Sequence, residues 1–186
     1  YYERLGFVAL PSIEHSAATN DFPSETSLSV RPATDADEDA IIGFHEASWD
    51  PSAVRIVRTR EHLRYFRFRN RADRAWIFTR EGKDVGYAIA AIHDGKRDDG
   101  TTSSSRTLWI DEWAAPGIST PDLFGALKTI AVQQSAERMA SWLSRWHEHA
   151  PFVATPRHEP IAMAAPLAHL NSIDPHQTFF GSLDHF

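Results

Sequence analysis

The chain has 186 residues, a formal net charge of −6 and no cysteine. The lack of cysteine excludes disulfides, zinc–thiolate sites and thiol catalysis, and it is compatible with the reducing cytoplasm, where we expect the protein. The acidic balance gives no general attraction to nucleic acid or to anionic membranes, and no apolar run approaches the length of a membrane span. The 42% hydrophobic content is enough for the core of one domain.

The first residues show two kinds of pattern. Tyr1–Pro11 starts like the last turn of a helix, with Gly6 just beyond its end, and Phe7–Leu10 is typical of a short strand. Residues 12–26 are polar and keep no period, which predicts a linker.

A new domain is predicted to begin after this linker. Leu28–Thr34 alternates apolar and polar residues, as a half-buried strand does, and Asp35–Ala47 follows as an amphipathic helix with acidic residues in its first turn. Arginines crowd Arg55–Arg74, and a second helix is predicted over Arg60–Arg69. Arginine interleaved with aromatic residues is compatible with nucleic-acid binding, but the acidic total favours a solvated or salt-bridged helix face.

The middle of the chain predicts a run of strands. Ala75–Thr79 and Val85–Ile92 form a hairpin in which Gly82 supplies the turn, and Gly86 indicates a bulge or a close backbone approach. Asp94–Arg106 is polar and rich in turn residues, which predicts a mobile loop.

A strand, loop and helix follow, and they are the clearest landmark in the sequence. Thr107–Ala114 is rich in aromatic and β-branched residues, and Pro121–Ala136 has an apolar face that predicts burial of Leu123, Leu127 and Ile130. Thr120 suits the N-cap of this helix.

The remaining elements are less regular. Arg138–Leu143 can form a strand, His147–His158 a short helix, and Ile161–Leu167 and Gln177–Leu183 two final strands. Histidines are frequent in this part of the chain, but they show no established ligand spacing, so we expect no metal site.

Three short motifs in these elements resemble the GNAT superfamily of N-acetyltransferases. Tyr-Glu-Arg-Leu-Gly-Phe (residues 2–7) looks like the closing sequence of the family's last helix, Val-Arg-Pro-Ala-Thr-Asp-Ala-Asp (residues 30–37) is similar to its first strand and helix, and Val-Gly-Tyr-Ala (residues 85–88) resembles its third strand. The resemblance implies an α/β GNAT-like fold, with a mixed central sheet flanked by helices. Residues 1–11 would be the tail of a preceding GNAT-like domain, 12–26 a linker and 27–186 a second GNAT-like domain, the C-terminal half of a tandem protein.

The same resemblance implies a set of site residues. Acetyl-CoA is the family's cofactor, and its binding groups would fall on Trp113, Ala115, Ser119 and Thr120. In the family a tyrosine of the closing motif often serves as general acid, which corresponds to Tyr2. Asp111 or Glu112 would be the base that draws a proton from the amine, and because the two alternate along a strand, only one can face a cleft.

The loop before the last long helix departs from the family's glycine-rich phosphate loop. No glycine lies between Gly117 and Gly125, so side chains would hold a pyrophosphate away from the backbone. Asp122 in the first helical turn can itself occupy the positive end of the helix. The sequence therefore predicts that this half lacks a working phosphate loop.

Three hypotheses for function follow. In the first, the intact protein moves an acetyl group from acetyl-CoA to a small-molecule or peptide amine, and this degenerate half is a scaffold, a partner of the preceding domain or a wall of the substrate cleft. In the second, this half is an active acetyltransferase with an atypical cofactor loop. In the third, it is a non-enzymatic interaction module that uses the arginine-rich segment.

Overall fold

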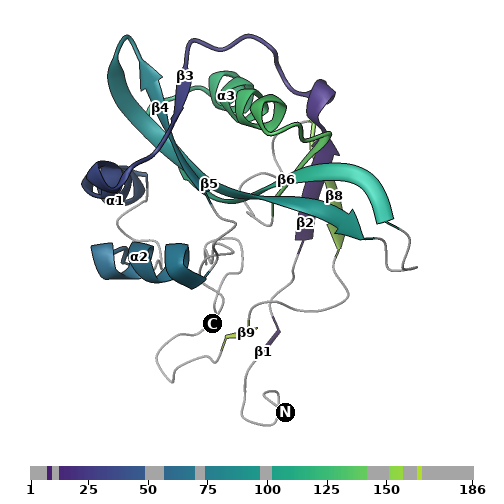
Figure 1. Cartoon of the computed structure of the whole chain (residues 1–186), viewed down its shortest axis with the longest axis horizontal. Coiled ribbons are helices and arrows are strands. Elements are labelled where there is room, and N and C mark those ends of the chain that lie inside the picture. The colour runs from purple at the N-terminus through teal and green to yellow at the C-terminus, as the bar shows by residue number, and fades with distance from the viewer. Residues whose placement is uncertain are drawn as a thin grey trace.

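A computed structural model of the chain describes residues 8–9, 13–48, 57–69, 74–96, 102–141, 151–156 and 163–164. Seven strands form one sheet: β2 (Ile13–Ala18), β3 (Ser29–Pro32), β4 (Arg74–Arg80), β5 (Lys83–Lys96), β6 (Thr102–Ala114), β7 (Arg138–Ser141) and β8 (Val153–Pro156). Their order across the sheet is β3-β4-β5-β6-β7-β2-β8 (Figure 1). Two further short strands, β1 (Val8–Ala9) and β9 (Met163–Ala164), pair with each other.

The main sheet is mixed. β6 and β7 run parallel, and every other neighbouring pair is antiparallel. The parallel pair needs a crossover connection, which is supplied by α3 (Thr120–Gln133). This arrangement confirms the predicted α/β fold with a mixed central sheet flanked by helices.

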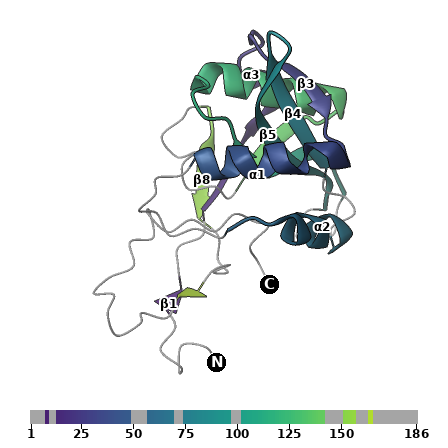
Figure 2. The same cartoon turned by 90° about the vertical axis from the view of Figure 1, so that its left-hand side faces the viewer.

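Helices cover both faces of the sheet. α1 (Glu38–Ala47) and α2 (Arg60–Arg69) lie one above the other on one side, and α3 lies on the opposite side (Figures 1 and 2). Two single turns of 3-10 helix, η2 (Thr19–Asp21) and η3 (Asp35–Asp37), precede β3 and α1 respectively. The sequence assigned residues 35–37 to the α-helix. They form a separate turn instead, closed by a capping box between Thr34 and Asp37.

The two faces of the sheet bury separate cores. The larger core joins the sheet to α3, and Leu123, Leu127 and Ile130 are buried in it as predicted. The smaller core joins the sheet to α1 and α2 through Ile41 and Leu63. Alternation along the strands divides their side chains between these cores, so that Phe78 contributes to the first and the adjacent Ile77 to the second.

The linker predicted over residues 12–26 is wrong in structural terms, because Ile13–Ala18 forms β2. This strand pairs antiparallel with β7 on one side and with β8 on the other. Its sequence, Ile-Glu-His-Ser-Ala-Ala, has no clear β pattern, so its conformation is set by pairing on both edges rather than by local preference. The domain boundaries that we assigned around this segment stay a prediction.

Residues Thr19–Leu28, hereafter the strap, run from β2 along the outer face of α3 to β3 (Figure 1). At the C-terminal end of the helix the Thr19 hydroxyl donates to the carbonyl of Ala136 (2.8 Å). In the middle, Lys128 Nζ donates to the carbonyl of Phe22 (2.7 Å). At the N-terminal end the Thr26 hydroxyl donates to the carbonyl of Asp122 (2.7 Å). The strap is therefore fastened along the whole helix.

Three other predictions can be compared with the structure. The loop predicted over Asp94–Arg106 is wrong at both ends, because β5 and β6 extend into it and pair as far as Lys96 and Thr102. The helix predicted over His147–His158 is wrong where the structure describes it, because Val153–Pro156 forms β8.

Gly86 was predicted to mark a bulge or a close backbone approach. A Cβ there would lie 2.6 Å from the carbonyl oxygen of Ala114, which confirms the close approach.

Candidate functional site

A β-bulge in β6 decides which side of the sheet Glu112 occupies. Ala90 of β5 pairs with Ile110 and the adjacent Ile89 pairs with Glu112, so Asp111 is the extra residue. Ile110 therefore packs on the α3 side, whereas Glu112, two residues later, faces α1 and α2. Without the bulge the two side chains would share a face.

Glu112 lies at the centre of a buried polar cluster formed by residues Arg58, His45 and Tyr87. Arg58 Nε donates to Glu112 Oε2 (3.1 Å), and Arg58 Nη2 also binds this oxygen. The Tyr87 hydroxyl donates to Oε1, and His45 Nδ1 lies 3.6 Å from the same oxygen and 3.3 Å from the Tyr87 hydroxyl. These four side chains come from β6, the segment before α2, α1 and β5.

The cluster stabilises the ionised form of Glu112. Burial by itself would raise the pKa of this carboxyl group. The hydrogen bond with the His45 ring and the charge of Arg58 outweigh that effect and lower the pKa to about 2. A general base works best when its pKa is near the working pH. A carboxylate whose pKa is about 2, and whose two oxygens already accept hydrogen bonds, is better suited to fixing Arg58 in place than to accepting a proton.

The other residues of the predicted site lie apart from this cluster. Asp111 is buried at the bulge, with an exposed fraction of 8%. Trp113 is half-buried and Ala115 buried, and both pack against the core on the α3 side. Tyr2 lies outside the described residues. The sheet thus separates Glu112 from Trp113 and Ala115.

The start of α3 differs in one detail from the prediction. Ser119, not Thr120, is the N-cap residue, and its hydroxyl oxygen accepts from the amide of Asp122 (3.4 Å). Thr120 is the first residue of the helix and is followed by Pro121. The shift of one residue places the proline at the second helical position, where its missing N–H still costs no hydrogen bond.

The Asp122 carboxylate accepts hydrogen bonds from three donors at the N-terminal end of α3. Oδ1 accepts the backbone N–H of Ser27 in the strap (2.8 Å), and Oδ2 accepts from the Ser119 hydroxyl (2.9 Å) and from Arg80 Nη2 (3.0 Å). The Ser27 amide and the Ser119 hydroxyl lower the pKa of Asp122, with a smaller contribution from Arg80. A negative charge of the chain itself therefore lies where a helix N-terminus would otherwise attract an anion.

The strap also approaches α3 closely at Gly125. A Cβ at this position would lie 2.7 Å from the carbonyl oxygen of Glu25 and 2.7 Å from the Thr26 Cβ. The glycine is thus needed for the contact between helix and strap, and it does not leave room for a ligand. With Asp122 at the helix end and the strap beside it, the residues present do not fit the pyrophosphate of acetyl-CoA.

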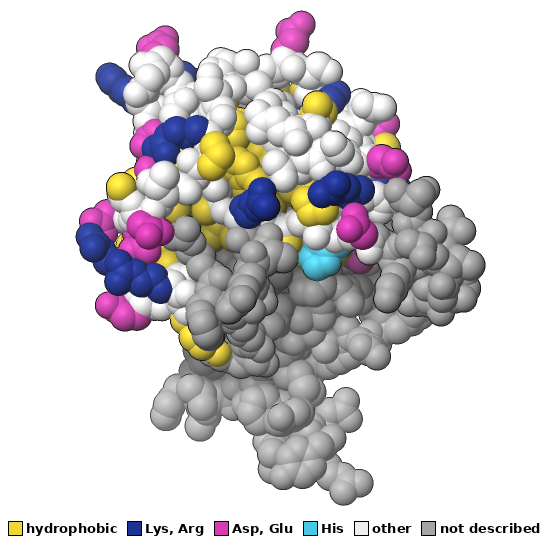
Figure 3. Space-filling view, viewed as in Figure 1, with side chains coloured by type: hydrophobic (Ala, Val, Ile, Leu, Met, Phe, Trp, Pro, Cys, Tyr) yellow, Lys and Arg dark blue, Asp and Glu magenta, His cyan; other side chains and the backbone are white. Residues whose placement is uncertain are grey.

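The sequence did not identify Arg58, His45 or Tyr87 as candidate site residues, although Tyr87 lies in the motif of residues 85–88. Arg58 stood among several arginines near a predicted helix, and no local pattern distinguished it. The expectation of a salt-bridged arginine face is confirmed for Arg60, which binds Asp39, and for Arg64, which binds Glu38. On the face seen in Figure 3, the basic and acidic side chains of the described residues are likewise intermixed.

Two absences hold for the part of the chain that the structure describes. No group of three or more His, Cys, Asp or Glu side chains is placed to hold a metal ion. No helix in the same residues has the length and apolar character needed to cross a membrane. The histidine-rich positions His147, His149, His158 and His185 fall outside the described ranges.

Solved structures show which fold this arrangement of strands and helices represents. A GCN5-related N-acetyltransferase from Kribbella flavida matches 85% of the chain with a TM-score of 0.54 and 18% identity. A second one, from Anabaena variabilis, matches 75% with a TM-score of 0.53 and 16% identity. A probable N-acyltransferase from Enterococcus faecalis matches 83% with a TM-score of 0.60 and 16% identity. The chain has the GNAT fold.

The chain corresponds to only part of each of these proteins, which limits what the matches show about its function. The chain spans 37%, 35% and 40% of the Kribbella, Anabaena and Enterococcus proteins respectively. No protein-family model matches the sequence, and no curated protein matches it. At this level of identity the matches establish the GNAT fold, whereas activity and ligands have to be argued from the side chains.

Proposed function

We propose that the intact protein transfers an acetyl group from acetyl-CoA to a small-molecule or peptide amine, and that this domain contributes as a scaffold or as a wall of the substrate cleft. A preceding GNAT-like domain would hold the cofactor. The GNAT fold supports the reaction class, and the limited share of each neighbour that the chain spans supports a longer protein. The lack of cysteine is compatible with a cytoplasmic location.

One observation is the main support for the proposal that this domain does not bind CoA. The N-terminal end of α3 is occupied by Asp122, which is held by the strap amide of Ser27, by Ser119 and by Arg80. A phosphate that approached the same donors would have to displace this carboxylate and would meet its charge. The domain is therefore a poor CoA receptor even though its fold is that of the family.

Glu112 supports the same role. Its low pKa and its contacts with Arg58 and Tyr87 make it a structural anion that fastens the segment before α2 to the sheet. An active acetyltransferase of this chain alone would need a base other than an ion-paired Glu112. Asp111 is the second carboxylate of the strand, and it is buried at the bulge.

Isothermal titration calorimetry of the chain with acetyl-CoA tests this proposal directly. We expect no saturable binding by the unaltered chain. Asp122→Asn removes the charge but keeps an oxygen and the side-chain shape, so a weak saturable signal in this variant alone would support a site closed by charge. Asp84→Asn is the matched control, because it removes a carboxylate that also binds an arginine, Arg31, away from α3. Saturable binding by the unaltered chain would overturn the non-binding role and favour an active domain with an atypical loop.

A further inference from the structure

β2 comes before β3 in the chain but lies near the opposite edge of the sheet. It is inserted between β7 and β8 and pairs antiparallel with both, so that its main chain has a partner on each side (Figure 1). β8 is the edge strand, and among the described residues β2 is its only neighbour in the sheet. β2 therefore joins β8 to the rest of the sheet.

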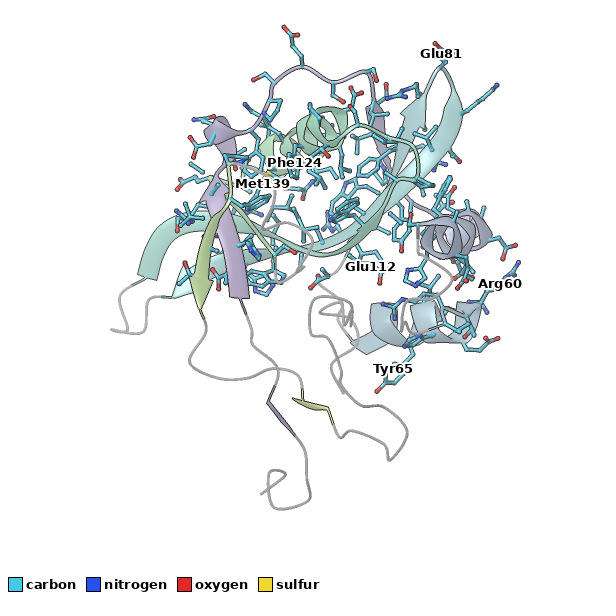
Figure 4. The ribbon with its side chains drawn as sticks, turned by 180° about the vertical axis from the view of Figure 1, so that it is seen from behind. Arg60, Tyr65, Glu81, Glu112, Phe124 and Met139 are labelled. Carbon is cyan, nitrogen blue, oxygen red and sulfur yellow. The ribbon has the colours of Figure 1, made fainter. Side chains whose placement is uncertain are left out.

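The turn that follows β2 adds side-chain contacts on the α3 side. Phe22 is almost fully buried, and its ring meets Phe124 of α3 and Phe152 before β8 edge to face, with centroid separations of 5.6 Å and 4.8 Å. Phe124 and Met139, both labelled in Figure 4, belong to the same core as Phe22. Aromatic contacts of this geometry add to the stabilisation that burial gives.

Hydrogen bonds also fix the chain after β2. The Thr19 N–H donates to the carbonyl of Glu137 (2.8 Å), and Lys128 Nζ donates to the Ser24 hydroxyl (2.9 Å). The stretch Ile13–Ser24, hereafter the donor segment, is thus bound to β7, β8 and α3 along its length. Every one of these contacts is non-covalent, so none of them requires the donor segment to be joined to β3 through the strap.

The donor segment is bound in the way that some proteins bind extended peptides. In strand addition, main-chain hydrogen bonds give affinity and alternate side chains give specificity. Here the strand is paired on both edges rather than on one, and small residues such as Ser16 and Ala17 are buried between its neighbours. Phe22 supplies a large, specific side chain beyond the strand.

We propose that β7, β8, Phe124 and Phe152 form a binding site for an extended peptide, which the donor segment occupies within its own chain. The same site binds this segment when it is supplied as a separate peptide. The recognised ligand is a strand with small residues, followed by a phenylalanine. The proposal needs no acetyl-CoA and goes beyond the function proposed above. Since β8 pairs with the donor segment, occupation of the site also decides whether the sheet extends to β8.

Cutting the full chain within the strap tests the site. A recognition sequence for a specific protease is inserted between Ser24 and Glu25, which are both exposed. After cleavage, residues 1–24 should stay with residues 25–186 in size-exclusion chromatography, because the cut breaks none of the contacts of the donor segment described above. The uncut variant, carried through the same steps, is the reference.

Exchange then shows whether the site accepts the segment from a separate molecule. The cut protein is unfolded in urea and refolded with an isotope-labelled peptide of residues 1–24, which is identical to the released piece. Native mass spectrometry counts the labelled complexes, and the labelled peptide should enter in proportion to its share of the total peptide. Phe22→Ala in the labelled peptide should lower its incorporation by at least about 100-fold, because truncation of a buried phenylalanine is among the costliest core substitutions.

Two further labelled peptides test the strand pairing and its specificity. Ser16→Pro removes an N–H at a position that is paired with strands on both sides, so it should also prevent incorporation. Asn20→Ala is the matched control, because Asn20 is exposed in the turn between β2 and Phe22. It should enter as the unaltered peptide does.

Three results would overturn the proposal. Separation of the two pieces after the cut, without denaturant, would mean that the covalent connection is needed to hold the donor segment. Failure of the labelled peptide to enter, while the uncut variant refolds, would mean that the site forms only within one continuous chain. Equal incorporation of the Phe22→Ala, Ser16→Pro and Asn20→Ala peptides would mean that contacts other than those described hold the peptide.

Discussion

Two of the carboxylate–arginine pairs among the described residues lie on opposite faces of one sheet, and they differ in burial. Glu112 binds Arg58 on the α1/α2 side, where the two side chains are 5% and 1% exposed. Asp122 binds Arg80 at the end of α3, where the exposed fractions are 25% and 35%. Each carboxylate also accepts hydrogen bonds from other groups, namely Tyr87 in the first pair and Ser27 and Ser119 in the second.

The difference in burial gives the two pairs different consequences. Water can replace a lost partner of Asp122, because this carboxylate is at the surface. Little water reaches Glu112, so the removal of its partner leaves an uncompensated charge inside the protein. We therefore expect the Glu112 pair to govern stability and the Asp122 pair to govern which ligands can approach α3.

Arg58→Met should produce the largest effect. Methionine keeps much of the aliphatic length but leaves Glu112 charged and buried, and breaking a buried ion pair in this way costs about 3–5 kcal/mol. Urea unfolding followed by circular dichroism measures the change. A loss under about 1 kcal/mol would mean that Glu112 is reached by water or takes up a proton at little cost.

The stability of the chain should fall in acid because of Glu112. Its pKa in the folded protein, about 2, is below its ordinary value of 4.5, so the stabilisation is fully present above pH 4.5 and is lost as the pH falls toward 2. The lowering corresponds to about 3 kcal/mol. The measurement compares the unfolding free energies of the unaltered chain and Glu112→Gln from pH 7 to pH 2.5. The difference between the two curves should shrink in acid, and a constant difference would contradict the assignment.

The sequence predicted those elements whose apolar residues repeat with a clear period. Leu123, Leu127 and Ile130 share a face at helical spacing, which fixed both the position of α3 and its buried side. β2 could not be found in this way, since its six residues become a strand only when β7 and β8 are in place on either side. Long-range pairing overrides a weak local preference there.

The candidate site was less predictable than the fold. Strict alternation along the strand predicts that Asp111 and Glu112 face opposite sides of the sheet. The bulge at Asp111 interrupts this alternation. The position of a bulge depends on the register of the two paired strands, which a local sequence pattern does not show. The partner of Glu112 is 54 residues away in the chain and is one arginine among several. Asp122, by contrast, lies in the first turn of α3, so its effect on the helix end could be predicted locally.

Gly125→Ala tests whether the strap closes the α3 side as tightly as the structure indicates. The added methyl group would lie 2.7 Å from the Glu25 carbonyl oxygen, so helix or strap has to move, and overpacking of this kind costs about 1–3 kcal/mol. Gly43→Ala is the control, because a Cβ there meets nothing within 4 Å and an alanine inside a helix stabilises it by about 0.5–1 kcal/mol. Equal effects of both substitutions on the urea midpoint would mean that the strap does not pack on α3.

Arg80→Met should have the smallest effect on stability and thus completes the comparison with Arg58→Met. Arg80 is partly exposed, and the Asp122 carboxylate keeps its hydrogen bonds from Ser27 and Ser119 when the guanidinium is removed. Its remaining charge can be hydrated, so we expect the urea midpoint to stay within the error of the measurement. The same variant should still fail to bind acetyl-CoA, because it removes a positive charge and leaves Asp122 at the helix end. A loss of stability comparable to that of Arg58→Met would show that the α3 end is as dry as the Glu112 cluster, and burial would then no longer explain the difference between the two pairs.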